Sequence, residues 1–383
     1  MIVGVPKEPI AGELRVAATP ESVKQLVAAG LEVSVEKGAG EAAGYSDESF
    51  RAAGASISKN FSPAAVDVLA HVRPLAPSVI KKLKKGSITV GLASPASELN
   101  SVKALRDAKI TSFSMELVPR ISRAQSMDAL TSQALVAGYR CVLEAANRLP
   151  RFFPLYMTAA GTVPPATVLV LGAGVAGLQA IATAKRLGAK VNAYDVRSAS
   201  ADEVRSMGGN FIELDLEVSA DGAGGYAKEL AADRVRMQQE LLTPFVTGAD
   251  VIITTAAIPG RPAPRLITSK MMEDMKSGSV VIDLAAETGG NVEGSKPGAD
   301  VAVKVGKTGG IVTLVGMKDV ASAMAFDASR LYAKNISNLL ELMVSSGKVA
   351  PDFEDEVVEG ACLTHGGQVL HGPTAEALTS ASG

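Results

Sequence analysis

Three glycines between two apolar segments are the residues whose spacing points most directly to chemistry. Gly172, Gly174 and Gly177 follow an apolar run at 168–171 and precede a helix-like run, and Asp195 closes the next strand-like segment. In a G-x-G-x-x-G turn the first glycine permits the tight turn, the second lets the backbone approach a pyrophosphate, and the third lets the helix lie close to the strand. Phosphates then meet the positive end of that helix. The pattern predicts a dinucleotide site, although an ordinary α/β core also uses glycines in tight turns.

The acid after the turn indicates which dinucleotide fits. A carboxylate at Asp195 accepts hydrogen bonds from an adenosine ribose and repels a 2′-phosphate, which favours NAD(H) over NADP(H). Arg197 weakens that preference slightly. The predicted cofactor residues of this segment are Gly172, Gly174, Val175, Ala176, Gly177, Asp195, Val196 and Arg197.

Two further segments end predicted strands of the same unit. Ligands bind at loops that follow the carboxyl ends of parallel strands. We therefore expect the cofactor to contact Thr255, Ala256 and Ala257 after the third strand, and Leu284, Ala285 and Glu287 after the fourth.

Groups that could move a proton are scarce. A dehydrogenase acting on an alcohol or amine usually needs a His or Lys for the proton that accompanies the hydride, and this chain has 3 histidines. His365 and His371 fall in a predicted C-terminal hairpin and are too few for a zinc site, so no metal is expected. His71 ends an apolar strand run, where a structural histidine is the alternative to a functional one.

The segment 119–128 is the most distinctive polar cluster, and it lies between a strand end and a long helical pattern. Arg120, Gln125 and Asp128 can orient a ribose, a carboxamide and a partner's phosphates by directed hydrogen bonds. The alternative is a helix N-terminus in which Ser126 or Asp128 caps the helix and Arg123 is solvated.

Composition narrows the class of protein. The 383 residues suffice for two domains, and 38 Lys plus Arg against 40 Asp plus Glu leave no basic field for nucleic acid. Two cysteines make no disulfide framework and fit a reducing, cytoplasmic compartment, and no secretory signal is evident.

Apolar periodicity predicts the α/β class: two Rossmann-like, doubly wound parallel-sheet domains joined by long helices, with the cofactor in the interdomain cleft. The first domain is expected to comprise residues 1–130 and 322–383, and the NAD(H)-binding domain residues 131–321. Predicted strands lie at 2–5, 32–35, 66–72 and 88–92, then at 168–171, 191–194, 251–255, 280–284 and 311–315; the long helices lie at 129–149 and 321–343.

Three segments need separate interpretation. No charge occurs between Arg151 and Lys185, but prolines and glycines argue against a membrane span, and we interpret the run as a buried parallel strand and the packed face of its helix. Residues 357–364 and 368–370 predict a hairpin. The glycine-bearing stretch 216–228 fits either a mobile lid or a plain solvated connection.

Several motifs together carry a family resemblance over nearly the whole chain. They are Lys7-Glu8, Glu13-Leu14-Arg15-Val16, Thr19-Pro20, Gly38-Ala39-Gly40, the segment from Met115 to Asp128, and Ala159-Ala160-Gly161-Thr162-Val163-Pro164-Pro165. The chain resembles the NAD(H)-binding component of proton-translocating nicotinamide nucleotide transhydrogenase.

The resemblance implies an activity and partners. Hydride would pass directly between NADH bound here and NADP⁺ on a partner component, without an acid or base, while a membrane-spanning component translocates protons. Gln125 would reach toward the second nucleotide, and Gly225 and Tyr226 would belong to a mobile loop that closes over NAD(H). The family also implies a homodimer in the cytoplasm, held at the inner membrane by its partner subunits.

Alanine dehydrogenase, a relative of that family, is the main competing hypothesis, and a non-catalytic nucleotide-binding regulatory subunit is another. The dehydrogenase uses a substrate-binding lysine and a catalytic histidine in its first domain. This chain has His71 where the lysine would lie and Gly91 or Leu92 near the histidine position. His71 and the stretch from Asp319 to Met324 also depart from the transhydrogenase pattern.

Overall fold

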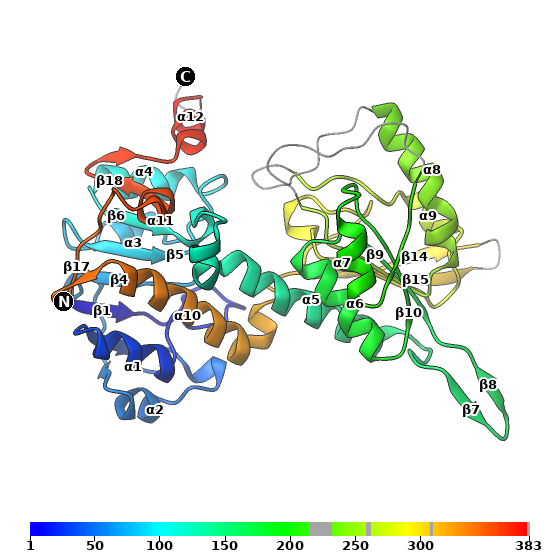
Figure 1. Cartoon of the computed structure of the whole chain (residues 1–383), viewed down its shortest axis with the longest axis horizontal. Helices are drawn as coiled ribbons and strands as arrows, with labels where there is room; N and C mark the ends of the chain where they lie inside the picture. Colours follow the sequence, from blue (N-terminus) through cyan, green and yellow to red (C-terminus); the bar gives the residue numbers. More distant parts are fainter. Residues whose placement is uncertain (215–231, 258–261, 307–308, 381–383) are drawn as a thin grey trace. The chain divides into compact units, whose positions relative to one another are not determined.

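The chain folds into two compact α/β units, residues 1–133 with 321–383 and residues 134–320 (Figure 1). The computed structural model describes residues 1–214, 232–257, 262–306 and 309–380. Helix α5 (Ala129–Arg148) begins in the first unit and continues into the second. The predicted α/β class with Rossmann-like parallel sheets is confirmed.

The sheet of the first unit has the strand order β19-β18-β6-β5-β4-β1-β2-β3. Strands β1 to β6 are parallel, whereas β18 pairs antiparallel with β6 and β19. The strands are β1 (Ile2–Val5), β2 (Glu32–Glu36), β3 (Ser56–Ser58), β4 (Val68–Ala70), β5 (Ile88–Gly91), β6 (Thr111–Ser114), β18 (Cys362–His365) and β19 (Gln368–Val369), with a separate hairpin of β16 (Val344–Ser345) and β17 (Lys348–Val349).

Local signals start the helices of this unit. Helix α1 begins after a capping box in which Thr19 and Ser22 satisfy each other's backbone N–H groups, with Pro20 in the first turn. The helices are α1 (Pro20–Ala28), α2 (Asp47–Ala52), α3 (Pro77–Ile80), α4 (Leu99–Asp107), α10 (Ala325–Leu342), α11 (Glu356–Ala361) and α12 (Gly372–Ser380), and the 3₁₀ turns are η1 (Glu41–Ala43), η2 (Pro63–Ala65), η3 (Met115–Leu117), η4 (Ser122–Met127) and η6 (Ser322–Met324).

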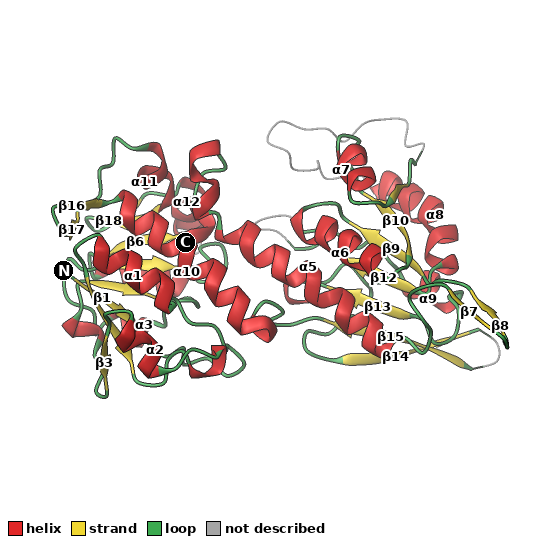
Figure 2. Cartoon of the chain, turned by 60° about the horizontal axis from the view of Figure 1, so that its bottom comes forward, coloured by secondary structure: helices red, strands yellow, loops and turns green. Residues whose placement is uncertain are grey.

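The sheet of the second unit has the order β11-β10-β9-β12-β13-β15-β14 (Figure 2). The order reverses between β9 and β12, which is the switch point at which Rossmann sheets bind dinucleotides. Strands β9 (Thr167–Leu171), β10 (Lys190–Tyr194), β11 (Asn210–Phe211), β12 (Val251–Thr254), β13 (Val280–Asp283) and β15 (Gly310–Gly316) are parallel, and β14 (Asp300–Val305) is antiparallel at the edge. The helices are α6 (Val175–Arg186), α7 (Ser200–Ser206), α8 (Ala232–Gly248) and α9 (Ser269–Glu273), with the 3₁₀ turn η5 (Ala286–Thr288).

Both faces of this second sheet are buried. Along β9, Val168 and Val170 belong to one apolar cluster, and Leu169 and Leu171 belong to another. Successive side chains of a strand point to opposite faces, so an unbroken apolar run is what a parallel sheet covered on both sides requires. The strand therefore holds the turn at its carboxyl end in a rigid frame.

Two predictions about local structure are corrected. Residues 155–164 of the uncharged run are exposed and include the hairpin of β7 (Tyr156–Thr158) and β8 (Gly161–Val163), so only the later part of the run is a buried strand and packed helix. The C-terminal hairpin begins at residue 362 and not 357. Asp355 accepts hydrogen bonds from the N–H groups of Val357 and Val358, at 2.8 and 3.4 Å, and so caps helix α11.

The helices within the described ranges are too short or too polar to cross a bilayer. None of them combines the length and the apolar character that crossing requires.

Candidate functional site

The glycine turn lies between β9 and α6, and two of its glycines are required by close contacts. Gly172 has a φ of +104°, and a Cβ there would lie 2.6 Å from Oγ1 of Thr255. A Cβ on Gly177 would lie 1.8 Å from the carbonyl oxygen of Gly172. The turn closes on itself too tightly for any side chain at these positions.

Gly174 differs from its neighbours because it faces open space. Apart from its chain neighbours and its own helix, no atom of the described residues lies within 4 Å of the position that its Cβ would take, and it is the N-cap of α6 without a side-chain hydrogen bond to the helix. The first amide groups of an uncapped helix are free to bind an anion, and the helix dipole adds to the attraction. Half-buried Ala176 and exposed Val175 follow in that first turn.

Asp195 follows β10 and points back to the turn. Its Oδ2 accepts hydrogen bonds from the backbone N–H of Ala173 at 2.7 Å and from Nη2 of Arg197 at 3.1 Å. Its Oδ1 accepts from the backbone N–H and from Nε of Arg197, both at 2.9 Å. The carboxylate thus lies beside the turn, at the position predicted for the ribose, with Val196 half-buried next to it.

The loop after β12 supports the turn directly. The hydroxyl of Thr255 donates a hydrogen bond of 3.1 Å to the carbonyl of Gly172. Thr255 therefore fixes the turn's backbone, a role that its position in the sequence did not reveal. Ala256 is half-buried and Ala257 is exposed.

The loop after β13 carries the remaining predicted contacts, and a buried acid organises it. Asp283 accepts hydrogen bonds from the N–H groups of Ala285, Asn291 and Val292 at 3.0 to 3.2 Å. Leu284 is half-buried, Ala285 is buried, and exposed Glu287 accepts a hydrogen bond from the N–H of residue 319.

Asn291 was missing from the predicted site. Its amide nitrogen donates hydrogen bonds of 2.8 Å to the carbonyls of both Ala256 and Pro264, so it ties the loop after β12 to the loop after β13. Its side-chain oxygen is buried without a hydrogen-bond partner among the described residues. Its place eight residues after Asp283 gave no sequence signal for this bridging role, because the contact depends on how two loops meet.

In the first unit, the turn η4 presents polar side chains from an anchored backbone. Ala124 and Met127 are buried, while Arg120 and Gln125 are exposed. The carbonyl of Ser126 accepts hydrogen bonds from Asn335 at 2.9 Å and Asn338 at 3.1 Å on α10. The turn is therefore a fixed platform for its two exposed groups.

Asp128 and Arg123 have structural partners in this turn. The Asp128 carboxylate accepts from the N–H of Thr131 at 2.8 Å and from its hydroxyl at 2.6 Å, so it caps α5. Arg123 pairs with Asp355 at 2.7 Å and with Glu356 at 3.2 Å. Hydrogen bonding to Arg123 lowers the pKa of Asp355 to about 2. Arg123 is thus fixed to the cap of α11 and not simply solvated.

His71 is buried and serves the fold. Its Nδ1 lies 2.7 Å from the carbonyl of Arg73 and so donates a hydrogen bond to it, and burial lowers the pKa of His71 to about 4. A Cβ on Gly91 would lie 2.5 Å from that nitrogen. The ring therefore fills the space in which a side chain at residue 91 would stand, and it stays neutral near pH 7.

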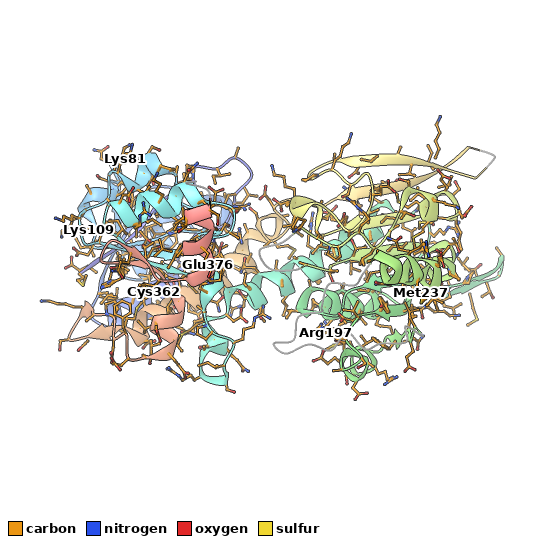
Figure 3. The ribbon with its side chains drawn as sticks, turned by 90° about the horizontal axis from the view of Figure 1, so that it is seen from above. Lys81, Lys109, Arg197, Met237, Cys362 and Glu376 are labelled. Carbon is orange, nitrogen blue, oxygen red and sulfur yellow. The ribbon has the colours of Figure 1, made fainter. Side chains whose placement is uncertain are left out.

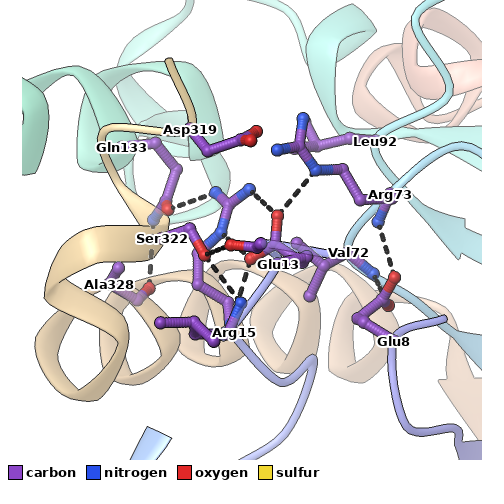
Figure 4. A network of polar contacts seen from close by, with 12 residues as sticks. Glu8, Glu13, Arg15, Val72, Arg73, Leu92, Gln133, Asp319, Ser322 and Ala328 are labelled. Carbon is purple, nitrogen blue, oxygen red and sulfur yellow. Dashed lines mark hydrogen bonds and ion pairs between the residues drawn. The ribbon is translucent and has the colours of Figure 1, made fainter. Parts of the chain in front are cut away.

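The early Lys-Glu and Arg-Val motifs form a buried ion-pair network (Figure 4). Glu13 accepts hydrogen bonds from Nε and Nη2 of Arg15 at 2.7 and 2.6 Å and from Nε of Arg73 at 2.6 Å. Glu8 accepts from the N–H groups of Val72 and Arg73. Burial raises the pKa of Glu8 to about 7, against the effect of these two hydrogen bonds. The network fastens the loop after β1 to the end of β4.

The other predicted residues, Gly225 and Tyr226, lie outside the described residues. Within the described ranges, no three His, Cys, Asp or Glu side chains gather as a metal site.

The fold and turn define a class: a two-unit α/β protein whose second unit is a Rossmann-type dinucleotide-binding domain. The model of the alanine dehydrogenase/PNT N-terminal domain matches residues 4–137, and that of the alanine dehydrogenase/PNT C-terminal domain matches residues 141–372. The chain belongs to the alanine dehydrogenase/PNT family.

Within that family the chain is similar to transhydrogenases over its whole length. It is 48% identical over 382 residues to an NAD(P) transhydrogenase subunit alpha of Rhodospirillum rubrum, covering 97% of this chain and 98% of the relative. The solved transhydrogenase of Sinorhizobium meliloti matches with a TM-score of 0.84 and 42% identity, over 97% of this chain and 100% of that one. The alanine dehydrogenase of Methanococcus maripaludis is 32% identical over 299 residues, covering 76% of this chain and 74% of the relative. The predicted resemblance is confirmed.

Proposed function

We propose that this chain is the NAD(H)-binding component of a proton-translocating NAD(P) transhydrogenase and passes hydride between NADH and an NADP⁺ held by a partner component. The observation that carries the proposal is the turn at Gly172–Gly177. Open space in front of Gly174, uncapped amides of α6 and the carboxylate of Asp195 fit a pyrophosphate and an adenosine ribose. These are groups that NAD(H) contains.

The chemistry of the remaining residues supports hydride exchange between two nicotinamides. Such a transfer needs no proton at the reacting carbons, so the protein has to hold two rings in a reactive geometry. His71 is neutral and fixed to a carbonyl, and residue 91 has no side chain. The positions that matter in an alanine dehydrogenase thus supply no acid or base here.

Arg120, Gln125 and Asp128 are proposed to act from the first unit. Gln125 is exposed on an anchored turn and would align the nicotinamide with the second nucleotide. Asp128 would act mainly through the helix that it caps, and Arg120 would contact the nucleotide. Thr255, Ala256, Ala257, Leu284, Ala285 and Glu287 would line the nucleotide at the carboxyl ends of β12 and β13, and Gly225 with Tyr226 would close over it.

The partner components follow from the chemistry. NADP(H) would be bound by a separate component and protons would be moved by a membrane-spanning one, which would hold this chain at the cytoplasmic side of the inner membrane. The relative from Rhodospirillum rubrum carries a subunit name, which supports assembly with other subunits.

We also propose that the chain forms a homodimer through two apolar surfaces of the second unit. The hairpin of β7 and β8 is uncharged, and Tyr156, Met157 and Val163 on it are exposed, Met157 by 77%. Helix α8 exposes Met237, Leu241 and Phe245 at i, i+4 and i+8, on one face. A two-stranded hairpin with both faces in water is marginally stable, so a covering surface is expected.

A second copy is the occupant that accounts for both surfaces. In a twofold dimer each copy offers both surfaces, so the hairpin of one protomer can cover the stripe of its partner and the reverse. Replacing Tyr156, Met157 and Val163 together by Lys should give a monomer in light scattering, while Ile311→Lys, exposed outside both surfaces, should leave the dimer intact. A dimer that survives the triple change would refute this interface.

Hydride transfer in a reconstituted system tests the main proposal. The purified chain is mixed with an NADP(H)-binding component, and transfer from NADH to a thionicotinamide analogue of NADP⁺ is followed by absorbance. Transfer that requires both proteins supports the proposal. NADH oxidation driven by pyruvate and ammonia, without transfer, would instead show an alanine dehydrogenase. NADH binding without either reaction would leave a regulatory subunit.

A further inference from the structure

The carboxylate of Asp195 has no free acceptor position. A carboxylate offers about four lone-pair sites on its two oxygens. Four N–H groups occupy them: the backbone of Ala173, the backbone of Arg197, and Nε and Nη2 of the same arginine. The side chain of Asp195 is 8% exposed, so water does not compete for these sites to any large extent.

The four donors differ in how easily they can leave. The N–H groups of Ala173 and Arg197 belong to the backbone at the ends of β9 and β10, which the sheet fixes. The guanidinium of Arg197 is the end of a flexible side chain, and that side chain is 31% exposed (Figure 3). A ribose hydroxyl that donates to Asp195 must therefore replace Nε or Nη2 of Arg197.

We propose that Arg197 is an internal competitor of the adenosine ribose, which lowers the affinity for NAD(H) and narrows the discrimination against NADP(H). The inference rests on the proposed binding of NAD(H) at Asp195. With the guanidinium in place, the negative charge of Asp195 is compensated, so a 2′-phosphate meets less repulsion. For a component that exchanges nucleotide at every turnover, weaker binding also favours release of the oxidised product.

Removing the guanidinium should move two affinities in opposite directions. In Arg197→Ala the acceptor sites of Asp195 are open to the ribose, so NADH should bind about threefold to tenfold more tightly. The uncompensated carboxylate should repel the 2′-phosphate, so NADPH should bind more weakly by a similar factor. A general loss of structure would weaken both nucleotides, which separates the proposal from misfolding.

The test is a fluorescence titration of the full chain with NADH and with NADPH, for the wild type and two variants. Arg205→Ala is the matched control, because Arg205 on α7 is also paired with exposed acids, Asp202 and Glu213. The control should leave both dissociation constants unchanged. Weaker NADH binding by Arg197→Ala, or a shift of both nucleotides in one direction, would overturn the role of Arg197. Absence of NADH binding by the wild type would instead overturn the proposed function itself.

Discussion

The backbone N–H of Ala173 donates a 2.7 Å hydrogen bond to the carboxylate of Asp195, so the glycine turn after β9 is fixed to the acid after β10. The two strands are paired in parallel up to Leu171 and Tyr194, just before these residues. The acid is thus oriented before any nucleotide arrives, and the cost of ordering it on binding is small.

Replacing Asp195 by Ala should therefore weaken NADH binding by about tenfold or more, since a directed acceptor for the ribose is lost. Discrimination against NADPH should relax, because the repulsion of the 2′-phosphate disappears and Arg197 can then pair with it. Fluorescence titration with both nucleotides measures the change. Asp202→Ala, an acid on α7 with a side chain 93% exposed, is the control for loss of charge. Equal affinities in wild type and Asp195→Ala would exclude Asp195 from the ribose site.

Two glycines of the turn should fail in different ways. In Gly174→Ala the new methyl group points into open space, so the free energy of unfolding should change by less than about 1 kcal/mol, while NADH binding should be lost because the pyrophosphate can no longer approach. In Gly177→Ala the methyl group meets the carbonyl of Gly172 at 1.8 Å, which should cost about 1–3 kcal/mol of stability. Urea unfolding and NADH titration of both variants distinguish these effects. The reverse pattern would contradict the assigned roles.

Replacing Gln125 by Asn should slow hydride transfer far more than it weakens NADH binding. The backbone of η4 is held by Ala124 and Met127 in the core, so the shorter side chain retracts the amide without moving the turn. Single-turnover transfer with the partner component, compared with the dissociation constant of NADH, separates the two quantities. Ser122→Ala, exposed on the same turn, is the control. Equal losses in transfer and binding would argue against an aligning role.

Glu8 should make the stability of the protein fall as the pH rises from about 4.5 to about 7. Its pKa in the folded chain, about 7, exceeds the ordinary value of 4.5, so the folded state holds the proton over this range while the unfolded state releases it. Stability that depends on the protonated carboxyl is complete below pH 4.5 and is lost as the pH passes the folded pKa.

Glu8→Gln removes this titration, so the difference in unfolding free energy between wild type and variant should shift in favour of the variant on going from pH 5 to pH 8. Urea unfolding at the two pH values gives the difference. Glu48→Gln, an exposed acid on α2, should show no such shift. A difference independent of pH would mean that Glu8 is ionised throughout.

How much of the fold could be predicted from the sequence depended on the range of the interactions involved. The bounds of α5 were predicted within one residue at each end, 129–149 against Ala129–Arg148, because twenty residues of regular periodicity leave little choice. The hairpin of β7 and β8 was missed. An uncharged apolar run reads alike whether a strand is buried or exposed, since exposure depends on which other segments cover it.

The amino-acid sequence by itself determined the parallel-sheet class, the glycine turn and the acid that follows it. These features depend on local backbone geometry and on short periodicities, which neighbouring residues impose. The tertiary structure decided the pairing of Arg123 with Asp355, the bridge that Asn291 makes between two loops, and the filling of the space beside Gly91 by His71. It also filled the acceptor sites of Asp195 with Arg197. Each of these contacts requires exact placement of side chains by the folded backbone, and residue spacing along the chain does not encode that placement.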